Sequence, residues 1–186
     1  MDTLSALLIT RDEARKAQQV GVATVTPAEL MPGDVDEHVE YSTINYKDGL
    51  AITGKLPVVR RFPMIPGTDF AGTVTASTHA GYKSGDKVLL NGWGIGETHY
   101  GAFSQMARVN GDWLIPLPAE ISSREAMAVG TAGYTAMLSI RALEQQGIPP
   151  TGGPVVVTAA AGRGGSVATA PLSAARRPGY HVPVGP

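Results

Sequence analysis

Up to about residue 120, short apolar or alternating segments are separated by turns rich in glycine and proline, and this spacing most constrains the fold. The chain has 23 Gly and 14 Pro among 186 residues, and 43% of its residues are hydrophobic. Residues 11–19 are polar and are expected to form a turn between the first two strands. Short strands are expected at residues 5–9, 21–25, 35–42, 70–75, 87–91, 103–109 and 113–117. This pattern is typical of a β-barrel or a β-sandwich.

One acidic residue disturbs the alternation of the strand at residues 35–42. Val35, Val39 and Tyr41 share its apolar face, and Glu37 lies on the same face. A lone carboxylate in an apolar interior is costly unless it is paired. Glu37 is therefore a mismatch between the sequence and the core that the strand must build.

After residue 120 the chain changes in character. Ser122 and Glu125 have the spacing of a capping box, and a helix is expected over residues 131–146 with Gly147 as its stop. The β-branched run at residues 155–157 indicates a buried parallel strand. We predict an α/β protein with a large β part: a β-barrel domain at residues 1–120 and an incomplete parallel-sheet domain at residues 121–186.

Composition and charge exclude several classes of function. Lys and Arg total 15, Asp and Glu total 16, and the net charge of −1 argues against nucleic acid as a partner. The absence of Cys excludes disulfides and thiolate metal sites, and the four His show no ligand spacing, so no metal is assigned. The N-terminus lacks the pattern of a secretory signal, and no segment has the apolar length of a membrane span. We expect a cytoplasmic protein.

Five segments occur in an order that matches a known family: residues 45–54, 62–67, 69–73, 91–97 and 130–137. Together they resemble the acryloyl-CoA reductase branch of the zinc-free quinone-oxidoreductase-like family, within the medium-chain dehydrogenases/reductases. The resemblance implies a GroES-like β-barrel catalytic domain followed by a Rossmann domain that binds NADPH. It also implies reduction of the carbon–carbon double bond of acryloyl-CoA to propionyl-CoA, and a full-length protein that is a homodimer.

The residues at the family's metal-binding positions indicate which type of reaction to expect. Zinc-dependent relatives bind their catalytic metal through a Cys and a His, and this chain has Asn45 and Thr68 in those loops. The resemblance therefore points to hydride transfer onto an activated alkene or a quinone rather than to alcohol oxidation. Two alternatives stay open beside the enoyl-CoA reductase: an NADPH:quinone reductase, and a non-catalytic fragment of the catalytic domain.

The resemblance assigns catalysis to Asn45 and Asp69. Asn45 is a candidate hydrogen-bond donor to the thioester oxygen, and its alternative role is that of a helix N-cap. Asp69 is a candidate for holding a water, orienting Asn45 or transferring a proton, and its alternative role is to accept backbone N–H groups of the preceding turn. Asp48 and Lys47 are expected at the helix start and on the surface.

The cofactor residues implied by the resemblance fall into two segments. Tyr46 contacts the cofactor in the family, although by itself it would be interpreted as a half-buried aromatic. Ala161, Gly162, Arg163 and Gly164 lie between a strand and a helix-like run, where glycines allow the pyrophosphate to approach a helix N-terminus. The basic pair Arg60 and Arg61 has two interpretations, a contact for CoA phosphates or a solvated pair.

Three prolines depart from the family pattern near the end of the sequence. Pro171 falls inside the expected helix, and Pro178 and Pro183 are expected to break the helix end and the next strand. A proline in a helix interior removes a hydrogen bond and costs ~3 kcal/mol. We therefore expect a truncated form of the enzyme, a fragment, or a reading frame with errors near its end. Such a chain is expected to bind NADPH poorly and to have little activity.

Overall fold

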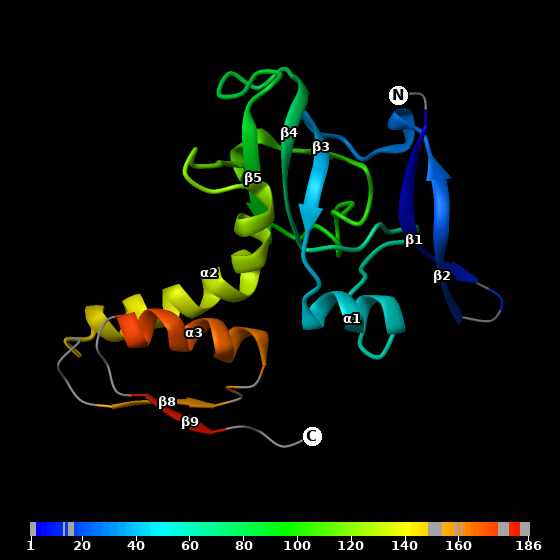
Figure 1. Ribbon diagram of the computed structural model, residues 1–186. Helices are drawn as coiled ribbons and strands as arrows, with labels where there is room; N and C mark the ends of the chain where they lie inside the picture. Colours follow the sequence, from blue (N-terminus) through cyan, green and yellow to red (C-terminus); the bar gives the residue numbers. More distant parts are fainter. Residues whose placement is uncertain are drawn as a thin grey trace. The chain divides into compact units, whose positions relative to one another are not determined.

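A five-stranded antiparallel sheet frames the first part of the chain in the computed structural model (Figure 1). The structure describes residues 3–12, 14, 17–148, 154–158, 160, 162–174 and 179–182. The strand order is β6-β3-β4-β5-β7. The strands are β3 (Val35–Ser42), β4 (Asp69–Ser77), β5 (Lys87–Asn91), β6 (Met106–Val109) and β7 (Ile115–Pro116). The chain divides into two compact units, Met1–Ala128 and Val129–Pro186.

The N-terminal hairpin is longer than the sequence predicts. Its strands β1 (Leu4–Asp12) and β2 (Ala17–Val25) continue into the segment expected to be a turn, so that prediction was wrong at both ends. Polar residues extend the hairpin because its outer face is exposed and each cross-strand backbone pair is still made. The Ile9 N–H donates to the Met64 carbonyl at 2.8 Å, which joins the hairpin to the rest of the first unit.

The main core of the first unit lies on one face of the five-stranded sheet. Its members are apolar side chains that alternate along the strands: Val35, Phe70, Val74, Val88, Leu90, Ile95, Ala102, Ala107, Val109 and Leu114. Burying a Val, Leu, Ile or Phe side chain stabilises the fold by about 1.5–3 kcal/mol. This burial is what makes the alternating segments of the sequence adopt one register.

A bulge in β3 lets two backbones approach each other closely. The register between β3 and β4 shifts between Val39 and Tyr41, opposite Gly72. A Cβ atom at Gly72 would lie 2.1 Å from the His38 carbonyl oxygen, a distance that no side chain tolerates. A glycine inside a strand is typical of such a bulge and close backbone approach.

The last two predicted strands of the barrel are shorter than expected. β6 starts at Met106 rather than at residue 103, because the Phe103 N–H donates to the Pro66 carbonyl in a loop. The segment expected as a strand from residue 113 forms only the two residues of β7, and Trp113 ends the short 3₁₀ helix η2 (Gly111–Trp113). A second 3₁₀ helix, η1 (Pro27–Glu29), follows the hairpin.

The two predicted helix starts are confirmed. α1 (Tyr46–Thr53) begins after Asn45 and ends at Gly54, whose φ of 65° is left-handed. α2 (Ser123–Gln145) opens with the predicted capping box, in which the Ser122 N–H donates to Glu125 Oε2 at 2.8 Å and Ser122 Oγ accepts from the Glu125 N–H. Gly130 interrupts α2 with a φ of 53°, and Gly147 follows its end with a φ of 77°.

The described residues of the second unit form one βαβ arrangement. β8 (Val155–Thr158) and β9 (Gly179–Val182) pair in parallel, and α3 (Arg163–Ala174) connects them. This is the beginning of the Rossmann sheet that the sequence predicts. The expectation that Pro171 disrupts the helix was wrong, because α3 runs through it; the burial of the adjacent Leu172 helps to hold the last turn. Pro178 and Pro183 lie outside the described residues.

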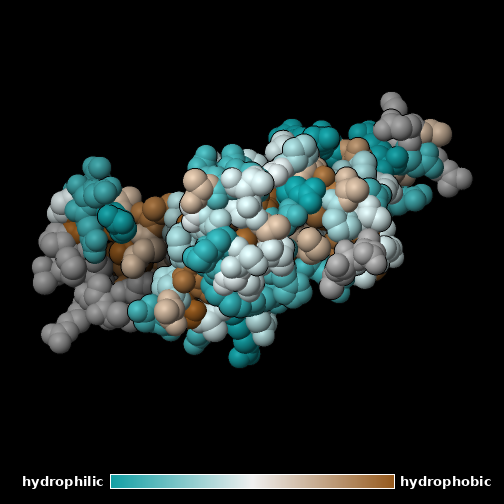
Figure 2. Space-filling model, turned by 90° about the horizontal axis from the view of Figure 1, so that it is seen from above, coloured by the Kyte–Doolittle hydropathy of each residue, from teal (hydrophilic) through white to brown (hydrophobic). Residues whose placement is uncertain are grey.

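The surface carries exposed apolar side chains in small groups. On the face that Figure 2 shows, hydrophobic patches are separated by hydrophilic or neutral surface. No helix within the described ranges has the length and hydropathy needed to cross a bilayer.

Glu37 is the one acidic side chain of β3 that points into the apolar core. It is fully buried, and neither of its carboxylate oxygens has a hydrogen-bond partner among the described residues. Burial, together with the charges of Asp36 and Asp34, raises the pKa of Glu37 from 4.5 to about 9. The mismatch in the sequence is therefore real, and the carboxyl is protonated in the folded protein at neutral pH.

This protonation predicts a pH-dependent loss of stability. Between pH 4.5 and about 9 the folded state keeps a proton on Glu37 that the unfolded state releases. The free energy of unfolding therefore falls as the pH rises, by about 1.4 kcal/mol per pH unit from this group. Urea denaturation from pH 5 to 8 should show this slope reduced in Glu37→Gln and Glu37→Val. Equal slopes in the three proteins would contradict the buried, protonated state.

Candidate functional site

The candidate site lies where β3 ends and β4 begins. The Ser42 hydroxyl at the end of β3 donates to the Asp69 carbonyl at 2.7 Å, so the two strand ends are held together. Gly67 allows the loop before β4 to turn, with a φ of 105° at a place where a Cβ atom would lie 2.8 Å from the Ala102 nitrogen. The chain then passes from β3 to Asn45, the N-cap of α1. These constraints place Asn45, Thr68 and Asp69 side by side.

The Asn45 amide links the two loops directly. Its Nδ2 donates to Thr68 Oγ1 at 2.9 Å and to Asp69 Oδ1 at 3.3 Å. The bond to Thr68 has normal length, whereas the bond to Asp69 is long and correspondingly weak. Asp69 is completely buried, and Thr68 is nearly so. The structure thus brings together both residues that the sequence predicts as catalytic, and it adds Thr68.

Asp48 completes this cluster, although the sequence predicts it only as a helix-start and surface residue. Its Oδ2 accepts from the Asn45 backbone N–H at 2.7 Å, which confirms the helix-start role. The side chain is buried, so the surface prediction was wrong. Burial raises the pKa of Asp48; hydrogen bonds from Asn45 and Thr68 oppose this, and the Asp69 charge reinforces it. An acid at the third position of a capped helix was the signal in the sequence.

The glycine-rich loop after β5 is attached to the same cluster. The Gly92 N–H donates to the Thr68 carbonyl at 2.9 Å, and Lys47 forms an ion pair with Glu97. Trp93 stacks on Trp113, with ring centroids 6.2 Å apart. His99 is buried and packs edge-on against Trp113. Trp93 and His99 are therefore packing residues of this loop.

The side chains beside Asn45 face outward. Tyr46 is 85% exposed and Ile44 is 75% exposed. The interpretation of Tyr46 as a half-buried aromatic was wrong, because the first turn of α1 buries Asp48 instead. An exposed aromatic ring next to the buried polar cluster is free to contact a ligand.

In the second unit, the predicted cofactor residues lie at the N-terminus of α3. Gly162 precedes the helix, Arg163 is its first residue, and the Ser166 N–H donates to the Gly162 carbonyl at 2.9 Å. A Cβ atom at Gly164 would meet nothing within 4 Å, so space is open above this turn. Ala161 lies outside the described residues. A helix N-terminus with open space after a parallel strand fits a phosphate group.

No group of three or more His, Asp or Glu side chains suited to a metal ion occurs in the described part of the chain. The polar cluster around Asn45 contains one amide, one hydroxyl and two carboxyl groups. These side chains hydrogen-bond to one another, which suits recognition of an oxygen atom and proton transfer.

Comparison with known proteins identifies the fold and the relatives of the chain. Residues 31–119 match the alcohol dehydrogenase GroES-like domain. The chain is 53% identical over 169 residues to the acrylyl-CoA reductase AcuI of Ruegeria pomeroyi, covering 91% of this chain and 51% of that protein. It is 44% identical to the putative quinone oxidoreductase YhfP of Bacillus subtilis, covering 88% of this chain and 48% of that protein.

A solved structure gives the same result. The YhdH oxidoreductase of Salmonella enterica, determined in complex with NADP, superposes with a TM-score of 0.91 at 48% identity. The superposition covers 95% of this chain and 54% of that one.

The fold is a medium-chain dehydrogenase/reductase scaffold, with a GroES-like domain followed by the start of a Rossmann sheet. Within that class, the chain is similar to acrylyl-CoA reductases and to the putative quinone oxidoreductase YhfP. It spans about half the length of the curated relatives that it matches.

The cluster makes a prediction for stability. Asp48→Ala leaves the partly buried Asn45 N–H without its acceptor, whereas Asp48→Asn keeps an oxygen at that position. We expect Asp48→Ala to be less stable than Asp48→Asn by about 1 kcal/mol, measured by urea denaturation at pH 7. Glu144→Ala, on the exposed part of α2, is the control and should change stability by less than about 0.5 kcal/mol. Equal stability of the two Asp48 variants would show that the capping bond is not needed.

Proposed function

We propose that this chain provides the substrate site and the first cofactor-binding unit of an NADPH-dependent enoyl-CoA reductase acting on acrylyl-CoA. The observation that carries the proposal is the hydrogen-bonded Asn45–Thr68–Asp69 cluster. The family resemblance implies that zinc-dependent relatives hold their metal in these loops. The name of the AcuI relative, 53% identical, supports acrylyl-CoA as the substrate.

Reduction of an enoyl thioester needs a donor for the thioester oxygen. Negative charge develops on that oxygen as a hydride reaches the β-carbon, and a preorganised donor stabilises it. Asn45 is suited to this task because one of its amide hydrogens is anchored at Thr68, 2.9 Å away. The other is held only by the 3.3 Å bond to Asp69, and a substrate oxygen can replace that bond.

Asp69 acts in this proposal as a positioning residue. Its buried carboxyl accepts from the Asn45 amide and fixes the rotation of that side chain before substrate arrives. Asp48 holds the Asn45 backbone from the other side. The α-carbon receives its proton either from one of these carboxyl groups or from a water that they hold.

The residues fit NADPH in each unit separately. Tyr46 exposes its ring beside Asn45, and the turn at Gly162–Gly164 with the N-terminus of α3 suits a phosphate. NADPH supplies the hydride when bound. The NADP present in the Salmonella enterica YhdH structure supports this cofactor.

An NADPH:quinone reductase is the second candidate, favoured by the similarity to YhfP. A quinone also accumulates charge on an oxygen during hydride transfer, so the Asn45 donor serves either substrate. Competition decides between them: acrylyl-CoA should suppress quinone reduction if the CoA thioester is the true substrate.

The first test is an NADPH titration of the purified 186-residue chain, followed by nicotinamide fluorescence with and without acrylyl-CoA. Saturable binding and oxidation of NADPH that depends on acrylyl-CoA are expected if the described elements suffice for the site. A folded chain that binds neither ligand would confine the proposed activity to a longer protein.

The role of Asn45 predicts a specific loss of rate. Asn45→Ala removes the donor and should lower kcat by about 10²-fold while changing KM much less. Asn110→Ala, which alters only the cap of η2, is the matched control and should keep the wild-type rate. Steady-state kinetics of NADPH oxidation measure both. A fall in kcat/KM that lies wholly in KM would contradict the role in charge stabilisation.

A further inference from the structure

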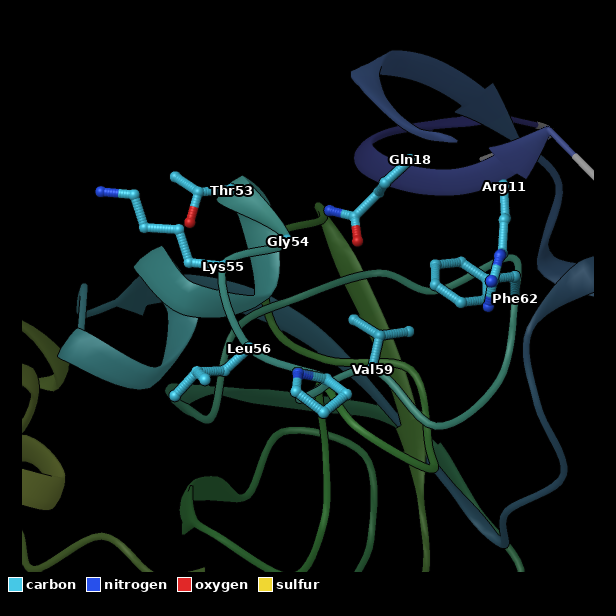
Figure 3. A pocket seen from close by; sticks show the side chains of 9 residues that line it. Arg11, Gln18, Thr53, Gly54, Lys55, Leu56, Val59 and Phe62 are labelled. Atoms are coloured by element: carbon cyan, nitrogen blue, oxygen red, sulfur yellow. The ribbon is translucent and has the colours of Figure 1, made fainter. Parts of the chain in front are cut away.

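A pocket lies at the C-terminal end of α1, at the opposite end of the helix from Asn45. It has a volume of about 410 Å³ and is lined by residues of the hairpin and of the loop after the helix (Figure 3). The lining residues are Arg11, Gln18, Thr53, Gly54, Lys55, Leu56, Pro57, Val59 and Phe62. The pocket belongs entirely to the first unit.

The charge of the pocket has one sign. Arg11 and Lys55 contribute two cations, and no carboxylate is among the lining residues. Figure 3 shows Arg11 beside the Phe62 ring on one side and Lys55 on the other. The Arg11 guanidinium lies 5.8 Å from the ring centroid, and neither cation forms an ion pair within the described residues. Two unpaired cations around one cavity attract a multiply charged anion.

Four of the other lining residues are apolar, beside the polar Gln18 and Thr53 and the helix-ending Gly54. Leu56, Pro57, Val59 and Phe62 form a wall between the two cations. An inorganic anion does not use such a surface, whereas a phosphorylated nucleotide places its base on apolar or aromatic side chains and its phosphates on Arg or Lys. The pocket therefore suits an adenosine phosphate better than a free ion.

The floor of the pocket is held in place. Gln18 Nε2 donates to the carbonyl oxygens of Ala51 and Ile52, at 2.6 and 3.0 Å. These bonds satisfy the last carbonyls of α1 and attach the hairpin to the helix end. Gly54 ends the helix in a left-handed conformation, which turns the following loop around the cavity. The pocket is thus formed without a ligand, which limits the entropy lost on binding.

We propose that this pocket binds the phosphorylated adenosine of a CoA thioester whose acyl group reaches Asn45. The inference rests on the proposed function for the identity of the acyl group. α1 separates the two places by about 12 Å at 1.5 Å per residue. The flexible pantetheine arm between the thioester and the nucleotide spans a distance of that order. Arg60 and Arg61, the pair singled out in the sequence, do not line the pocket.

Isothermal titration of the 186-residue chain with CoA, dephospho-CoA and pantetheine tests the proposal. CoA should bind most tightly. Dephospho-CoA, which lacks one phosphate, should bind less tightly, and pantetheine, which lacks the phosphorylated nucleotide, should bind least. Arg11→Met and Lys55→Met should each weaken CoA binding by about 10-fold, and the loss should be smaller for dephospho-CoA. Arg124→Met, which removes an exposed cation elsewhere in the first unit, is the control of equal charge and should change nothing.

Two results would overturn the assignment. One is CoA affinity that is the same in the double variant Arg11→Met/Lys55→Met as in the wild type, or undetectable in both. The other is an equal loss of NADPH affinity, which would assign the pocket to the cofactor because NADPH carries a similar phosphorylated adenosine. Thermal unfolding confirms that the variants are folded. CoA binding that depends on Arg11 and Lys55, without reduction of acrylyl-CoA, would support the pocket while contradicting the proposed function.

Discussion

The hydrogen bonds from Asn45 to Thr68 and Asp69 are the contact on which the candidate site depends. They join two loops that lie more than twenty residues apart in the sequence, and they exist because β3 and β4 pair side by side. The pairing in turn depends on the bulge opposite Gly72, where the two backbones approach too closely for any side chain. A change in that packing would separate the amide from its partners.

One helix, α1, connects the polar cluster around Asn45 with the cationic pocket. α1 begins at the buried polar cluster and ends at the cationic pocket. The Asn45 amide at its start donates to Thr68, and Gln18 donates to the carbonyls at its end, so both ends are bonded to other parts of the chain. The core of the five-stranded sheet also contains the protonated carboxyl of Glu37. The burial of many apolar side chains offsets the free-energy cost of desolvating it. The stability of the sheet and the geometry of the site are therefore coupled.

Much of the fold followed from local patterns. The strands at β3, β4, β5 and β8, the cap of α1, the capping box of α2 and the stop at Gly147 were all predicted. Predictions failed where local preference and tertiary contacts compete. The hairpin continued through polar residues, α3 continued through Pro171, and β6 started late because its expected first residues bond to a loop. In the hairpin and before β6, a backbone partner elsewhere in the chain decided the outcome, whereas the buried side chain of Leu172 helps to hold the last turn of α3.

By itself, the sequence determined the class of scaffold, the absence of thiolate ligands, and the positions of Asn45 and Asp69 as candidates, because these depend on residue types and their order. Only the tertiary structure decided that Asp48 is buried, that Tyr46 is exposed, that Thr68 anchors the amide, and that Arg11 and Lys55 line one pocket. Burial and side-chain partnership arise from contacts between residues far apart in the chain, and no local pattern encodes them.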